Sequence, residues 1–169
     1  MSTANLDNLN TTHHGEETTH DSPVIEDSFF GAHFTSRAGE QTPEAIQQHP
    51  IICLYFAARS SPPCRIFTPV LLNFYREVNM VEKRLEIIYV PRDKESDGFL
   101  AFMNQMPWLA IPFEDERILE FKRKYNIKGI PSLVVLGQKG EMITLEGRKD
   151  IIQKGEEAFD SWMEVYEEV

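Results

Sequence analysis

Ser61 and Cys64 are the two residues of this sequence whose types and spacing could do chemistry together. Only Pro62 and Pro63 separate them, and they follow an apolar run at residues 51–58. Serine followed by proline is typical of a helix start, because the hydroxyl caps the helix and proline lacks the N–H that a first helical residue leaves unpaired. Thiol chemistry at a helix N-terminus is therefore the first candidate activity.

Two effects act on the Cys64 thiol in opposite directions. The helix dipole and the neighbouring Arg65 favour the thiolate, whereas burial inside the first helical turn opposes it. The sequence leaves the balance open. An exposed Cys64 could form slow mixed disulfides, for example with glutathione, and an inaccessible one could not.

Two apolar runs predict the strands that position this helix start. Residues 51–58 and Leu85–Pro91 lack helical periodicity and are short, so both are predicted to be buried strands. Because a helix lies between them, they are expected to be parallel. The intervening helix, with Pro69 expected to kink its axis, should bury one apolar face. That face is predicted to comprise Phe67, Val70, Leu71, Phe74, Tyr75 and Val78.

Weaker patterns complete the chain. Further helices are predicted at residues 42–48 and after the charged turn at 92–95. A helix at 115–125 should turn inward Ile118, Leu119, Phe121 and Tyr125. A last helix at 150–167 should turn inward Ile152, Phe159, Trp162, Met163 and Tyr166. Gly140 separates two strands, 132–137 and 142–145, which should form a hairpin. An arm with Phe29, Phe30 and Phe34, as an edge strand or a packed segment, precedes the order β-α-β-α-α-β-β-α. This order predicts an α/β fold with a mixed central sheet and helices on both faces.

The composition limits the class of protein. A length of 169 residues with 41% hydrophobic content suits one domain with its own core. A net charge of −10 argues against a general nucleic-acid binder. No membrane span or signal-peptide core is predicted. Cys53 should be a small core residue. A reducing cytoplasmic location is therefore expected, with the nucleus as a further option. The sequence has no phosphate-binding loop and no paired Cys/His spacing, so we expect neither a cofactor nor a metal.

The N-terminal residues 1–23 are polar and are predicted to be a disordered tail before a single domain at residues 24–169. His13, His14 and His20 could bind a transition metal, but a mobile tail has no second shell to orient their imidazoles. A docking segment for a partner is the other reading of the tail.

Three segments resemble the tryparedoxin and nucleoredoxin branch of the thioredoxin superfamily. LYFAARSSPPCRIFTPVLLNFY resembles its active-site segment, and MPWLAIPF and YNIKGIPSL resemble two further blocks. Residues 147–162 look most like nucleoredoxin-like proteins. The resemblance covers about residues 30–166 in order and implies a thioredoxin-like fold.

The sequence departs from the usual motif of this branch, Trp-Cys-Pro-Pro-Cys-Arg. Aligned on Cys64, the tryptophan falls on Ser60 and the nucleophilic first cysteine on Ser61. In the dithiol mechanism the first thiolate attacks a substrate disulfide and the second thiol resolves the mixed disulfide. A hydroxyl forms no disulfide, and no neighbouring base activates Ser61. The dithiol cycle is therefore not available with Cys64 alone.

The resemblance also implies which residues would contact a substrate: Ser60, Pro62, Pro63, Arg65, Trp108, Ile130 and Pro131. In the superfamily the proline that matches Pro131 follows a cis peptide bond and faces the helix start, where the preceding backbone pairs with the substrate chain. By residue type alone, Trp108 is more typical of a core position than of a substrate platform.

Three functions remain open. The first is a protein-disulfide reductase of tryparedoxin or nucleoredoxin type with weak or monothiol activity at Cys64. The second is a redox-inactive module that binds a protein partner in the groove at Pro131. The third is a structural component of an assembly, anchored by the acidic C-terminus and the N-terminal arm. The family favours the first and the residues favour the second; the oligomeric state stays open.

Overall fold

A computed structural model of the chain describes residues 28–169. The expected disordered tail and its three histidines lie outside the described residues. The predicted central strands form where the sequence is most continuously apolar. Every residue of β3 (Ile51–Ala57) and of β4 (Leu85–Pro91) is buried, as are five of the six residues of β6 (Ser132–Gly137). β3 pairs parallel with β4 and antiparallel with β6, which confirms the predicted orientations.

The described residues form one seven-stranded sheet in the order β2-β1-β5-β4-β3-β6-β7. The flanking strands are β1 (Phe34–Ser36), β2 (Gly39–Gln41), β5 (Leu109–Ala110) and β7 (Met142–Thr144). The predicted hairpin of β6 and β7 is confirmed. The sequence patterns missed β2 and β5, because each is too short to show a period and exists only through pairing with a neighbouring strand.

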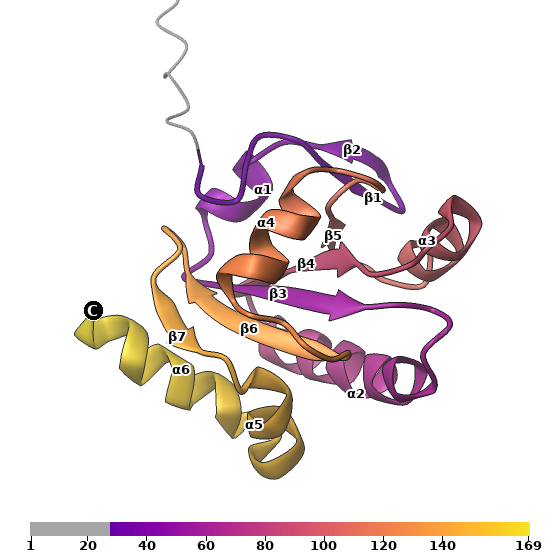
Figure 1. The fold of residues 1–169 in the computed structure, drawn as a ribbon. Helices are drawn as coiled ribbons and strands as arrows, with labels where there is room; N and C mark the ends of the chain where they lie inside the picture. Colours follow the sequence, from indigo (N-terminus) through magenta and orange to yellow (C-terminus); the bar gives the residue numbers. More distant parts are fainter. Residues whose placement is uncertain (1–27) are drawn as a thin grey trace, which may run out of the picture.

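Helices cover both faces of this sheet, as the sequence predicts. They are α1 (Glu44–Gln47), α2 (Pro62–Val78), α3 (Ser96–Met103), α4 (Arg117–Lys124), α5 (Gly147–Lys154) and α6 (Glu157–Glu168). α2, α5 and α6 lie on one side of the sheet, and α1 and α4 lie on the other (Figure 1). The predicted α/β class with a mixed central sheet is therefore confirmed. No helix in the described part of the chain is long and apolar enough to cross a membrane.

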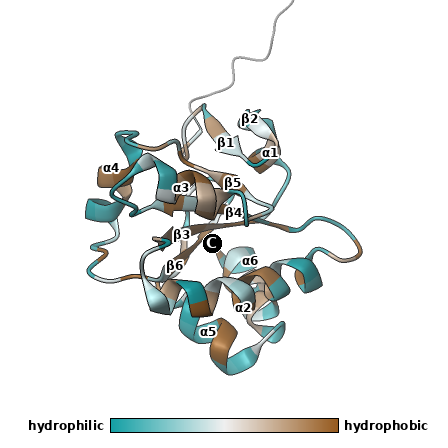
Figure 2. Cartoon of the chain, turned by 90° about the vertical axis from the view of Figure 1, so that its right-hand side faces the viewer, coloured by the Kyte–Doolittle hydropathy of each residue, from teal (hydrophilic) through white to brown (hydrophobic). Residues whose placement is uncertain are grey.

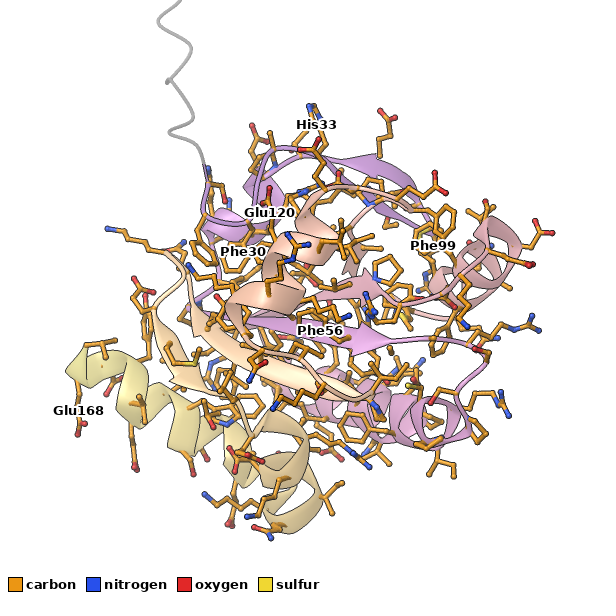
Figure 3. The ribbon with its side chains drawn as sticks, in the orientation of Figure 1. Phe30, His33, Phe56, Phe99, Glu120 and Glu168 are labelled. Atoms are coloured by element: carbon orange, nitrogen blue, oxygen red, sulfur yellow. The ribbon has the colours of Figure 1, made fainter. Side chains whose placement is uncertain are left out.

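Alternation along β3 divides the core in two. Cys53 and Tyr55 point into the cluster beneath α2, and Leu54 and Phe56 point into the cluster beneath α4. Figure 2 shows β3 and β6 in hydrophobic colours between helices that carry both colours. Phe56 lies with Phe30 on the α4 side of the sheet (Figure 3). Cys53 is fully buried, so its predicted core position is confirmed.

The predicted single helix at residues 150–167 is wrong. The chain forms α5 and α6 instead, and Gly155 between them has a φ of 59°, a conformation that glycine adopts without a steric penalty and that ends α5. The indole N–H of Trp162 donates to Asp150 at 2.9 Å and so ties α6 to α5. The change of axis leaves Ile152 exposed at 61%, outside the predicted apolar face.

Two other residues lie on the wrong side of the predicted helical faces. Val70 on α2 is 43% exposed and Leu119 on α4 is 52% exposed. The buried stripe of each helix is narrower than its apolar periodicity indicates, because the sheet covers only the residues directly above it.

Candidate functional site

Strand pairing brings three distant segments to one edge of the sheet. Ala57 at the end of β3 is paired with Pro91 at the end of β4, and Phe56 is paired with Ser132 at the start of β6. The residues that follow β3 and β4, and those that precede β6, therefore meet beside the N-terminus of α2. This edge is the site that the sequence predicts from Ser61 and Cys64.

Ser61 is the N-cap of α2. Its backbone is extended, with φ −84° and ψ 115°, and its side-chain oxygen accepts the backbone N–H of Cys64 at 3.4 Å. Pro62 and Pro63 follow in the first turn, where their missing N–H groups cost no helical hydrogen bond. Ser61 is half-buried, and the two prolines and Ser60 are exposed. The Ser61 hydroxyl thus serves as a helix cap.

Cys64 is closed off from solvent. Its exposed fraction is 0%, and it belongs to the core cluster beneath α2. Its backbone carbonyl accepts the Thr68 hydroxyl at 2.7 Å, and because Thr68 uses its proton there, the Tyr55 hydroxyl is the donor in the 2.8 Å bond to Thr68. Burial raises the pKa of Tyr55, so this hydroxyl keeps its proton. The chain around Cys64 is therefore held by a buried hydrogen-bond relay.

The second cysteine offers no partner for Cys64. Both cysteines are free, and burial raises the pKa of the Cys53 thiol. Cys53 lies on the strand in the core beneath α2, and no part of it is exposed. A thiol that is closed off from solvent and keeps its proton does not attack a substrate disulfide.

A polar loop contact positions the segment before α2. The backbone N–H of Arg59 donates to Asp93 at 2.9 Å, and the Arg65 guanidinium donates to the Arg59 carbonyl at 2.8 Å. The hydroxyl of Tyr89 donates to the other oxygen of Asp93. Asp93 lies in the charged turn at residues 92–95, for which the sequence favoured a solvated loop over a ligand contact; its place two residues after a buried parallel strand was the available signal.

These residues line a pocket of about 610 Å³ between the starts of α2 and α3. Arg59, Ser60 and Arg65 come from the α2 side, and Asp93, Lys94, Glu95, Asp97 and Gly98 come from the α3 side. Positive and negative side chains are mixed here, so the pocket has no single charge. Ser60 and Arg65, two of the predicted substrate contacts, are accessible in it.

Ile130 and Pro131 lie between two further pockets at the same edge. The peptide bond between them is cis, Ile130 is half-buried and Pro131 is buried. A pocket of about 390 Å³ on the α5 side is lined by Pro131, Ser132, Leu133, Leu145, Glu146, Arg148, Lys149, Ile152 and Gln153. A pocket of about 370 Å³ on the α4 side is lined by Arg92, Lys122, Ile127, Lys128, Gly129 and Ile130.

Trp108 is the predicted substrate contact that the structure does not bring to this surface. Its exposed fraction is 1%, and its ring packs edge-on against Tyr55 and Tyr75, with centroid distances of 6.3 and 5.3 Å. This is the core position that its residue type favoured. Its indole N–H has no hydrogen-bond partner within residues 28–169.

Comparisons with known proteins agree with this geometry. A family model described as thioredoxin-like matches residues 49–142. Nucleoredoxin from Bos taurus is 43% identical over 100 residues, which are 59% of this chain and 23% of that protein, so the chain spans about a quarter of that relative. Tryparedoxin from Trypanosoma brucei is similar with a TM-score of 0.72 at 28% identity, over 80% of this chain and 94% of that one. Thioredoxin from Wuchereria bancrofti is similar with a TM-score of 0.70 at 30% identity, over 82% of this chain and 99% of that one.

Proposed function

Since this chain belongs to the thioredoxin-like family and has an α/β thioredoxin-like fold, we propose that it is a nucleoredoxin-type protein that binds a protein partner and has at most weak disulfide reductase activity. Within the family we place it nearest the nucleoredoxin-like proteins, from the resemblance of residues 147–162. The partner segment would lie against Pro131 and the exposed start of α2.

The observation that carries this proposal is the burial of Cys64 behind Ser61. Reduction of a disulfide takes two electrons, which a dithiol supplies by becoming a disulfide itself. Here the accessible position holds a hydroxyl, and the one sulfur near it is 0% exposed. A single thiol could at most form a mixed disulfide, and it would first have to reach solvent.

The surface around Pro131 supports the binding role. The exposed residues Ser60, Pro62 and Pro63 share one edge with Pro131, and a pocket lies on either side of that proline. This arrangement leaves room for the side chains of an extended segment while offering it no accessible thiol. Both cysteines are free, which supports the expected reducing cytoplasmic or nuclear location.

The test is reduction of a generic protein disulfide with dithiothreitol as electron donor. We expect the natural chain to stay at the uncatalysed rate and Ser61→Cys to exceed it about tenfold or more, because the variant restores a dithiol. Ser61→Cys combined with Cys64→Ser is the matched control, since its one accessible thiol has no internal thiol to resolve a mixed disulfide and should therefore be slower than Ser61→Cys.

One outcome would overturn the proposal. If the natural chain reduces the substrate and Cys64→Ser abolishes the activity, Cys64 works alone and the protein is a monothiol enzyme. If the natural chain and a correctly folded Ser61→Cys are both inert, the groove has lost more than one sulfur, and the binding role gains.

A further inference from the structure

The pocket on the α4 side of Pro131 is built from three separate parts of the chain. Arg92 comes from the loop after β4, Lys122 from α4, and Lys128 from the loop between α4 and β6. We call it the basic pocket, and it comprises these three cations with Ile127, Gly129 and Ile130. The neighbouring Ile130–Pro131 bond places it directly beside the groove of the proposed function.

The charge of the basic pocket is not balanced by its own lining. No carboxylate is among its lining residues, whereas the larger pocket beside α3 sets three cations against three acids. Within residues 28–169 the ion pairs are Lys83 with Glu86 and Arg117 with Asp115, so none of the three cations is in one. In a chain with a net charge of −10, a concave site lined by unpaired cations is unusual.

Backbone N–H groups add hydrogen-bond donors to the cations of the basic pocket. The N–H groups of Lys128 and Gly129 donate to no acceptor in the described part of the chain. A Cβ placed on Gly129 would meet nothing within 4 Å, so this stretch of backbone is open to an approaching group. Half-buried Ile127 and Ile130 give the pocket an apolar lining beside these donors.

The net negative charge of the chain does not cancel this local effect. At physiological ionic strength the Debye length is about 8 Å, so exposed acids farther away are largely screened. A carboxylate in the basic pocket would be governed by Arg92, Lys122 and Lys128, which line it.

We propose that the basic pocket receives an aspartate or glutamate side chain of the partner segment bound at Pro131, and so selects acidic segments. The inference rests on the proposed binding role and adds the chemistry of the partner to it. Exposed ion pairs contribute little singly, but two or three together, with backbone N–H donors, give a preference of about tenfold.

The test uses a trap, the Ser61→Cys/Cys64→Ser variant, and nonapeptides with a central cysteine carried as its mixed disulfide with 2-nitro-5-thiobenzoate. The introduced thiolate displaces that coloured anion and forms a disulfide with the peptide, with no net oxidation. The peptides carry three Glu before the cysteine, three Glu after it, or Gln at all six positions. The rate of each peptide with the trap is divided by the rate of the same peptide with mercaptoethanol. Free cysteine, carried as the same mixed disulfide with 2-nitro-5-thiobenzoate, is the reference without a peptide.

We expect one of the two Glu peptides to react about tenfold faster than the Gln peptide. Adding Lys122→Glu and Lys128→Glu to the trap should reduce this ratio to twofold or less. Adding Lys139→Glu and Lys154→Glu, which changes the net charge equally at exposed sites in the β6–β7 turn and at the end of α5, should leave it unchanged.

Equal rates for Glu and Gln peptides, or the same loss in both charge variants, would overturn the acidic selection. The binding role is read separately from the Gln peptide. If that peptide reacts no faster than activated cysteine, the groove does not bind peptide and the proposed function fails; if it reacts faster without a Glu preference, only the basic-pocket inference fails.

Discussion

The side-chain oxygen of Ser61 accepts a hydrogen bond from the backbone N–H of Cys64, across the first turn of α2, at 3.4 Å. Ser61 therefore stabilises the helix whose core side holds Cys64. The hydrogen bond gives the Ser61 side chain a structural role as the cap of α2, whereas the sequence suggested thiol chemistry at this helix start.

The first prediction concerns this cap. Ser61→Ala should lower the free energy of unfolding by about 0.5–1 kcal/mol, the lower part of the usual range for lost caps, because the bond is long. Urea unfolding followed by circular dichroism measures the change. Ser61→Asp keeps a capping oxygen and should retain the stability of the natural chain; an equal loss in both variants would argue against the cap.

The second prediction is that both thiols are silent in the native protein. Cys53 and Cys64 are each 0% exposed, so neither should react with a thiol reagent before unfolding, and both should react in guanidinium. Ile66→Cys is the matched control, because Ile66 lies on the same helix and is 74% exposed. Its introduced thiol should react at least about 100-fold faster than either native thiol, which react only through local opening. A comparable native rate would show that α2 opens readily.

The third prediction concerns Arg117, which joins α4 to the N-terminal arm. Its guanidinium donates to Asp115 at 2.8 Å, to the Phe30 carbonyl at 3.0 Å and to the His33 carbonyl. Arg117→Lys should cost about 2 kcal/mol of unfolding free energy, because a lysine cannot reproduce this fork of charged hydrogen bonds. Hydrogen exchange should quicken in β1 and β2. Arg123→Lys, an exposed change on the same helix, should alter neither the unfolding free energy nor the exchange rates. If Arg117→Lys leaves both unchanged, Arg117 does not hold the N-terminal arm to α4.

The fourth prediction is a pH effect at Glu86. Burial raises the pKa of Glu86 above its ordinary value of 4.5, against the opposing effect of Lys83 at 2.5 Å. Between pH 4.5 and the raised pKa the folded chain holds a proton that the unfolded chain releases, so the contribution of Glu86 to stability falls as pH rises through this window. Glu86→Gln removes the titration. Its unfolding free energy relative to the natural chain should therefore increase with pH across the window and stay constant above it.

Unfolding curves at a series of pH values measure this difference. The exposed Glu82→Gln is the control and should run parallel to the natural chain throughout. A Glu86→Gln difference that declines with rising pH would mean that the pKa of Glu86 is lowered in the folded state and that its pairing with Lys83 outweighs burial.

Short-range signals predicted much of the fold. The apolar run of β3, the same signal in β4 and the Ser61-Pro62 helix start were each readable from neighbouring residues, and the structure has all three. The intervening helix also implied the parallel pairing of the two strands. The motifs around Cys64 and Pro131 then resembled one family, and residues 49–142 match its model.

The tertiary structure alone decided what the site can do. Cys64 is buried in a core cluster whose side chains come from separate elements, among them Tyr55 on β3 and Trp108 before β5. The basic pocket exists only because the loops after β4 and α4 meet. The exposure of Ile152 likewise follows from the change of axis between α5 and α6 at Gly155. Caps and periodicity act between residues a few positions apart, so the sequence by itself determined them. Solvent exclusion and pocket charge arise between segments that only folding brings together, which is why the sequence left both open.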